Sequence, residues 1–131
     1  MPLVPSFDER IRRVLVRGSG VITLTDIVTL IRTARAHIDH RMWPMLVDAR
    51  GAGTDLTTAD VDRLAAAVQD AIAQGPRGHV AIVADDEKLY SRMLEYEAKC
   101  AAFGVNYIRV FRLHPDAERW LDIVAAARHF G

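Results

Sequence analysis

Short apolar runs alternate along this chain with longer segments whose apolar residues recur every three or four positions. Residues 45–47 and 80–84 are apolar at successive positions, which is typical of strands covered on both faces. Between them, apolar residues recur at helical spacing from Val61 to Ile72, which is typical of a helix with one buried face. Repeated strand–helix–strand units imply right-handed crossovers and mostly parallel strands. The pattern therefore predicts an α/β fold.

The predicted order of elements is strand, strand, helix, strand, helix, strand, helix, strand, helix. Residues 10–18 (RIRRVLVRG) form the first strand, and two glycines then lead into a second strand at residues 21–24, which makes an antiparallel hairpin. Residues 106–112 (NYIRVFR) form the last strand. A length of 131 residues is usual for one domain. We therefore predict a single α/β domain, residues 1–131, with a mostly parallel four- or five-stranded sheet, an N-terminal antiparallel hairpin and about four helices.

Residues that can cap helices stand before the predicted helical segments. Thr25 is the predicted cap of the first helix. Thr57 is followed three residues later by Asp60, which resembles a capping box with Asp in place of the usual Glu. Asp85 or Asp86 can cap the third helix. The polar segment after residues 45–47 thus has a structural explanation.

The charges of the chain do not favour a polyanionic partner. Seventeen basic residues balance seventeen acidic ones, so bulk charge attracts neither nucleic acid nor an anionic membrane. Arg10, Arg12, Arg13 and Arg17 form the one local basic excess, and apolar residues are interleaved with them. We interpret these arginines as the solvated edge of the first strand, because charges on an edge strand discourage aggregation.

Nothing in the sequence indicates a membrane or secretory segment. No stretch approaches the roughly 20 apolar residues that span a bilayer, and the N-terminal MPLVPSFDER lacks the apolar run of a secretory signal. Cys100 is the single cysteine, so no internal disulfide can form. It lies on the apolar stripe of its helix, where we expect a small buried hydrophobe rather than a nucleophile. We expect a cytoplasmic protein.

Three segments carry a family resemblance through their order. VLVRGSGVITLTDIVTLI looks like an opening strand, a glycine turn and a first helix; MLVDARGAG looks like a strand ending in Asp; VFRLHPDAERWL looks like a closing strand and a helix with a Trp-Leu pair. Together they resemble the SpoIIAA-like branch of the bacterial STAS and Sec14-like domains, from Phe7 to Leu121. The resemblance implies a four- or five-stranded sheet with helices, and regulation by protein contact or binding of small or lipidic ligands.

The same resemblance draws attention to the start of the second predicted helix. In the anti-sigma-factor antagonists of the wider group, a serine at the start of the helix after the third strand is phosphorylated. Here the segment reads Asp55-Leu56-Thr57-Thr58-Ala59, without the Asp-Ser-Ser-Gly pattern. Thr57 or Thr58 could take the place of the serine, but this departure argues against a phosphoswitch.

Polar residues follow the ends of the predicted parallel strands, where ligands usually bind in open sheets. Asp48 and Asp85 stand just past two such ends, with Arg50, Arg112 and His114 close to others. Two carboxylates could hold Mg²⁺ or shuttle a proton. The alternative is that Asp85 and Asp86 cap a helix and Asp48 bonds to its own loop.

Other patterns that suggest chemistry are incomplete. The glycines of Gly51-Ala52-Gly53 lack the third glycine of a dinucleotide site and the Gly-Lys-Ser/Thr of a P-loop, so we interpret them as a connector. His37 and His40 supply too few ligands for zinc and are interpreted as surface residues. We predict no catalytic residue, no metal ligand and no cofactor.

The functional hypothesis is a non-catalytic cytoplasmic regulatory or binding module of the SpoIIAA-like type. It acts through a regulatory protein partner or a small or lipidic ligand, with no nucleic acid and no membrane span, and a homodimer is left open. The candidate binding residues are Asp48, Arg50, Thr57, Thr58 and Asp85. One alternative is a binder of lipid or another hydrophobic ligand, which needs an enclosed apolar cavity that competes with filling the core. Another is a small enzyme with an Asp48/Asp85 crevice and a divalent ion.

Overall fold

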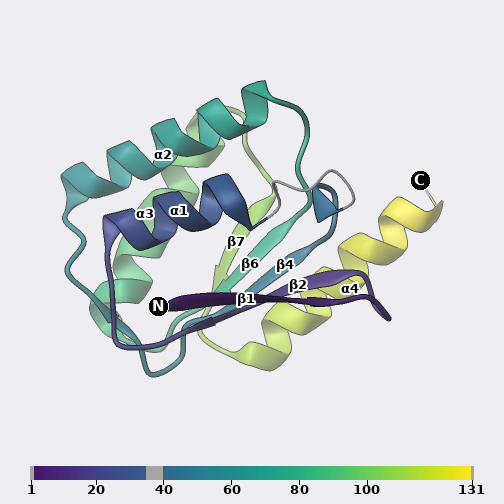
Figure 1. Ribbon diagram of the computed structural model, residues 1–131, viewed down its shortest axis with the longest axis horizontal. Helices are drawn as coiled ribbons and strands as arrows, with labels where there is room; N and C mark the ends of the chain where they lie inside the picture. Colours follow the sequence, from purple (N-terminus) through teal and green to yellow (C-terminus); the bar gives the residue numbers. More distant parts are fainter. Residues whose placement is uncertain (1, 35–39, 131) are drawn as a thin grey trace.

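A five-stranded sheet lies between two layers of helices in the computed structural model, which describes residues 2–34 and 40–130 (Figure 1). The strand order across this sheet is β1-β2-β4-β6-β7, with β1 antiparallel to β2 and the other neighbours parallel. Its strands are β1 (Leu3–Asp8), β2 (Arg13–Gly18), β4 (Met45–Asp48), β6 (Val80–Val83) and β7 (Ile108–Phe111). The predicted α/β class, the mostly parallel sheet and the antiparallel N-terminal hairpin are confirmed.

Four helices in the described ranges cover the two faces of the sheet unequally. They are α1 (Leu24–Thr33), α2 (Thr58–Ala73), α3 (Glu87–Ala102) and α4 (His114–Phe130). α1, α2 and α3 lie on one face and α4 lies on the other (Figure 1). Alternate strand residues point to opposite faces, so in β4 Met45 and Val47 join the larger core while Leu46 joins the smaller one under α4. Leu121 is fully buried in that smaller core and anchors α4.

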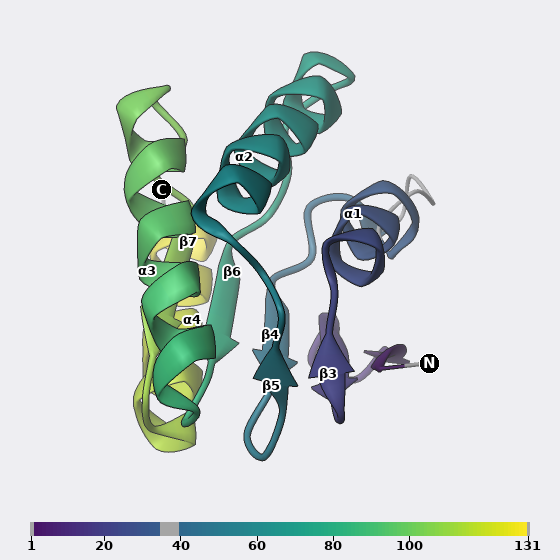
Figure 2. The ribbon, with the colours of Figure 1, turned by 90° about the vertical axis from the view of Figure 1, so that its left-hand side faces the viewer.

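The hairpin pairs different segments from those predicted. β2 pairs with β1, which the sequence reading did not recognise as a strand, and not with residues 21–24. β3 (Val21–Ile22) instead pairs in parallel with β5 (Gly53–Thr54) in a separate two-stranded sheet (Figure 2). Both sides of β2 are paired, one with β1 and the other with β4, so β2 has no side left for residues 21–24. Just beyond β2, the Ser19 amide still bonds to the segment before β1, donating to the Pro2 carbonyl at 2.8 Å. The chain after β2 therefore leaves the main sheet.

The interpretation of the arginines as a solvated edge is wrong for the edge position and for Arg13, although Arg10, Arg12 and Arg17 are exposed as predicted. β2 is an interior strand between β1 and β4, and Arg10 and Arg12 lie in the turn that precedes it. Arg13 is only 7% exposed, and its Nη2 lies 2.9 Å from Oδ1 of Asp122 on α4. A charge that points into a covered face needs a partner, and α4 supplies one. This ion pair helps to join α4 to the sheet.

The first helix begins earlier than predicted. Thr23, not Thr25, is the N-cap: its side chain accepts from the Asp26 amide at 3.2 Å, and Asp26 accepts from the Thr23 amide at 2.9 Å. This reciprocal capping box satisfies the amides of Thr23 and Asp26, which lie at the start of α1 and lack partners within the helix. The helical spacing of the sequence predicts an apolar stripe on this helix from Ile27 to Ile38. α1 ends at Thr33, and Ile38 lies outside the described residues.

The starts of α2 and α3 follow the predictions more closely. The capping box of Thr57 and Asp60 is confirmed at the start of α2. Asp86, not Asp85, caps α3 and accepts from the Leu89 amide at 3.0 Å. The sequence predicts an apolar stripe on α3 made of Leu89, Met93, Tyr96, Cys100 and Phe103. It is buried as far as Cys100, but Phe103 is exposed because the helix ends one residue before it.

The two outer strands carry features that block further pairing. On β7, the outward amide of Val110 donates to Oε1 of Glu97 on α3 at 2.7 Å. On β1, Pro5 lacks an amide proton in the middle of the strand. Exposed strand edges favour aggregation, and both features hinder the addition of a further strand. Within residues 2–34 and 40–130, no helix combines the length and hydrophobicity needed to cross a bilayer.

Candidate functional site

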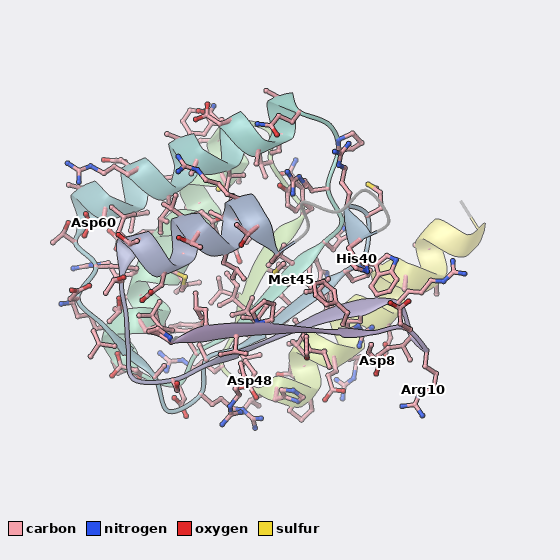
Figure 3. The ribbon with its side chains drawn as sticks, viewed as in Figure 1. Asp8, Arg10, His40, Met45, Asp48 and Asp60 are labelled. Carbon is pink, nitrogen blue, oxygen red and sulfur yellow. The ribbon has the colours of Figure 1, made fainter. Side chains whose placement is uncertain are left out.

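Asp48 lies at the carboxyl end of β4 (Figure 3). Two arginines bind its carboxylate. Arg50 donates from Nε to Oδ1 and from Nη2 to Oδ2, both at 2.8 Å, and Arg17 donates from Nη1 to Oδ2 at 2.7 Å. The side chain of Asp48 is only 13% exposed. The hydrogen bonds from Arg50 are the main reason that the pKa of Asp48 falls to about 2. The carboxylate is therefore ionised at physiological pH, and its negative charge is balanced by the two guanidinium groups.

Asp85 lies at the end of the neighbouring strand and has a different role. Its Oδ1 accepts from the Gly51 amide at 2.9 Å, which ties the loop after β4 to the end of β6. Gly51 has a positive φ of 81°, a conformation that favours glycine. As predicted, Asp48 and Asp85 lie at the carboxyl ends of neighbouring parallel strands, but each binds groups of the protein itself.

This geometry does not favour the crevice enzyme. A divalent ion at Asp48 would have to displace or tolerate two guanidinium groups. No three side chains of His, Cys, Asp or Glu gather as a metal site would require among the residues that the structure describes. A carboxylate with a pKa of about 2 is also a weak general base near neutral pH.

Thr57 and Thr58 lie at the far end of the same loop, where α2 begins. Thr57 uses its side-chain oxygen in the helix cap, accepting from the Asp60 amide at 3.2 Å. Thr58 donates to Oε1 of Glu95 on α3 at 3.1 Å, and Arg92 donates to the Leu56 carbonyl at 3.0 Å. The loop is thus attached at both ends, to Asp85 and to α3. Arg50 and Thr58 remain exposed on it.

The remaining polar residues at this edge also form pairs. Arg112 contacts Glu87 through two hydrogen bonds of 2.7 and 3.1 Å, and its guanidinium carbon lies 3.9 Å from the centre of the Tyr90 ring. His114 Nδ1 lies 2.6 Å from Oε1 of Glu118. The edge therefore alternates in sign, without the single-sign field that concentrates a charged substrate.

Of the two histidines interpreted as surface residues, the structure describes only His40. His37 lies outside the described residues. The interpretation of His40 as a surface residue is wrong. Its side chain is 19% exposed, and its ring stacks on Phe7 with centroids 4.3 Å apart. The ring also meets Trp43 at 4.6 Å, so His40 helps to pack the chain against β1.

The other candidate site is an apolar cavity beneath α1. Its volume is about 80 Å³, and it lies between α1, the sheet, α2 and α3. α1 contributes Ile27, Leu30 and Ile31 to the lining, and the sheet contributes Met45, Val47 and Ile82 among others. Ala49 and Ala71 also line it, and their short side chains leave room. Ligand sites are usually concave and mostly apolar, so this cavity has the character of one.

The cavity explains an unusual property of α1. The helix has no buried residue, although its apolar residues Ile27, Leu30 and Ile31 all face the core. In contrast, α2 buries five residues and α3 buries four. The apolar face of α1 is only partly covered because it borders open volume.

From the sequence, a cavity was expected only if the protein binds a lipid or another hydrophobic ligand. The helical spacing of α1 shows which face it turns inward, but not how closely that face approaches the sheet. The one signal in the sequence is the pair of alanines, Ala49 and Ala71, whose small size matters only once the fold brings them together.

Comparison with known proteins does not assign this chain to a family. A scan against protein-family models, a search of the curated proteins and a search of the solved structures found no significant match. The resemblance to the SpoIIAA-like domains therefore stays a prediction.

Proposed function

We propose that this chain is a non-catalytic binding module that holds a small hydrophobic molecule between α1 and the sheet. The observation that carries the proposal is the apolar cavity of about 80 Å³ beneath a helix with no buried residue. Protein cores are normally packed as densely as organic crystals, so open apolar volume of this size calls for a reason.

The energy of the cavity supports an occupant. Unfilled apolar volume sealed inside a core costs about 24 cal/mol per Å³, so 80 Å³ corresponds to at most roughly 2 kcal/mol of lost stability. An apolar molecule that fills the cavity recovers part of this energy, in addition to the gain from leaving water. Binding is therefore favoured without any change in the fold.

The polar edge of the sheet supports catalysis less well. Both oxygens of Asp48 accept hydrogen bonds from arginines, and Asp85 holds the backbone of Gly51. Regulation through a protein that contacts Arg50 and Thr58 rests on the family resemblance and stays a prediction.

Titration of the protein with 1-hexanol, followed by NMR of the methyl groups, tests the proposal. We expect saturable shifts at Ile27, Ile31 and Ile82, because these residues line the cavity, and no comparable shift at the exposed Ile123 on α4. Ala71→Leu should weaken binding because the larger side chain occupies the cavity.

A matched control separates filling of the cavity from a general effect of the substitution. Ala101→Leu makes the same change at an exposed position on α3, and it should leave binding of 1-hexanol unaltered. Native mass spectrometry of freshly purified protein should show a retained small molecule. If the lining methyl groups did not shift at any concentration of 1-hexanol, the cavity would not be a binding site.

A further inference from the structure

We infer that the molecule bound beneath α1 is a small monocarboxylic acid, with its carboxylate at Arg77 and its apolar tail in the cavity. The inference rests on the proposed function and adds the chemical class and orientation of the ligand.

Among the residues that the structure describes, one charged side chain lines the cavity. Of the described residues that line it, Arg77 alone is charged, and Tyr96 and Tyr107 are the other residues with polar side-chain atoms. Sites for small molecules typically combine an apolar lining with a few polar groups that fix orientation. A guanidinium carries five donors in a planar fork that matches a carboxylate, so it can bind one in addition to contacts with the protein. One positive charge fits a ligand with one negative charge.

The position of Arg77 gives the cavity two different ends. Arg77 precedes β6 by three residues and Tyr107 directly precedes β7, so both lie near the amino ends of the parallel strands. Figure 3 labels Met45 toward this end and Asp48 toward the opposite end. The lining residues Ala49 and Leu89 follow β4 and β6, at the carboxyl ends. The ligand's charged group is therefore placed at the amino ends and its tail points toward the carboxyl ends.

This site is separate from the paired charges at the sheet edge. Asp48 and its arginines stand at the carboxyl end of β4, whereas Arg77 stands at the amino end of β6, which runs parallel to β4. None of Asp48, Arg50 or Asp85 lines the cavity. The ligand therefore does not use the residues that the sequence first suggested.

The volume limits the size of the ligand. An engineered cavity of about 150 Å³ holds benzene, and the cavity here is about 80 Å³. This leaves room for a short aliphatic chain and not for the two long chains of a phospholipid.

Three probes with the same tail and different head groups test the inference: hexanoate, 1-hexanol and hexylammonium. We expect hexanoate to bind about tenfold more tightly than 1-hexanol at neutral pH, because a hydrogen bond to a charged partner adds that much. Hexylammonium should bind least tightly, and added salt should weaken only the preference for hexanoate. These measurements use the unaltered protein and need no variant.

Arg77→Met then tests the role of the guanidinium. Its apolar side chain keeps much of the volume of the arginine, so binding of 1-hexanol should persist while the preference for hexanoate disappears. Arg63→Met is the matched control, because Arg63 lies on α2 with a side chain that is 71% exposed, and it should change neither affinity.

The possible results separate the two levels of the argument. Binding of 1-hexanol with no preference for hexanoate would overturn the carboxylate assignment and leave the proposed function standing. A preference for hexanoate that survived in Arg77→Met would also overturn the assignment. Binding of none of the three probes would refute the proposed function and, with it, this inference.

Discussion

At the scale of the residue, the carboxylate of Asp48 is bound by two arginines of the protein itself. Its carboxylate accepts hydrogen bonds from Arg17 on β2 and from Arg50 in the loop, so it joins two neighbouring strands and the connection that leaves them. The sequence placed Asp48 correctly at the end of a strand. It did not predict the arginines as partners, because Arg17 lies 31 positions away and only the parallel pairing of β2 with β4 brings it close.

Asp48→Asn should lower the free energy of unfolding by about 1–2 kcal/mol at pH 7, after allowing for solvent screening of the exposed arginines. The pKa of Asp48 is about 2 in the folded protein against 3.8 ordinarily. Its stabilising effect is therefore complete above about pH 4 and is lost as the pH falls toward 2. Urea unfolding at pH 7, 4 and 3 measures the difference between variant and parent.

The control for this variant is Asp62→Asn, which removes a carboxylate with a side chain that is 61% exposed and paired with Lys99. An exposed pair of this kind contributes little, so its removal should change stability by less than about 1 kcal/mol. A cost of Asp48→Asn that stayed constant from pH 7 to pH 3 would show that the charge of Asp48 is not the cause.

Cys100 shows the same contrast between a residue's chemistry and its setting. It is 1% exposed, and burial raises the pKa of its thiol to about 11. The thiol is therefore protonated at physiological pH, which agrees with the sequence expectation of a small buried hydrophobe. Here the residue's place on a helical stripe was enough to predict its environment.

At the scale of the element, helix α3 protects the outer strand β7. The Val110 amide would otherwise point outward with no strand beside it, and Glu97 accepts its hydrogen bond at 2.7 Å. One side chain thus takes the place of a missing neighbouring strand.

Glu97→Ala should therefore expose the Val110 amide and increase its hydrogen-exchange rate about tenfold, because a hydrogen bond to a charged group is lost. Exchange measured by NMR at constant pH gives the rate for this amide alone. Glu97→Gln is the control, since its amide oxygen can still accept the bond and should keep most of the protection. Equal exchange rates in Glu97→Ala and the parent protein would contradict the assigned role.

Elements were predictable from the sequence where a local pattern determined them. The capping box of α2 and the apolar run of β6 each depend on a few adjacent residues, and both are present as predicted. β1 was missed because Pro5 and its polar residues give it no strand signal, and its pairing with β2 decides its structure. β3 was assigned to the wrong sheet because its partner β5 comes about 30 residues later.

At the scale of the whole molecule, the three helices on one face do not pack equally well. α2 buries five residues against the sheet and its neighbours, while α1 buries none. Alternation of strands and helices predicts the layers, but the fit between layers depends on the volumes of side chains from four different elements. The cavity is the result, and no local pattern of residues shows it.

The unequal packing predicts unequal local stability. Amides in the last turns of α1 should exchange at least about tenfold faster than those in the middle of α2, because opening α1 exposes less apolar surface. Hydrogen exchange followed by mass spectrometry of peptic fragments compares the two helices in one sample. Comparable protection in both helices would show that α1 opens only when the whole domain unfolds.

The cavity beneath α1 also gives the molecule a mechanical property. Pressure favours states of smaller volume, and unfolding eliminates internal empty space. If all 80 Å³ were eliminated, the molar volume would shrink by about 50 mL. Hydrostatic pressure should therefore destabilise this fold through the cavity. A ligand that fills the cavity should make the folded protein less compressible.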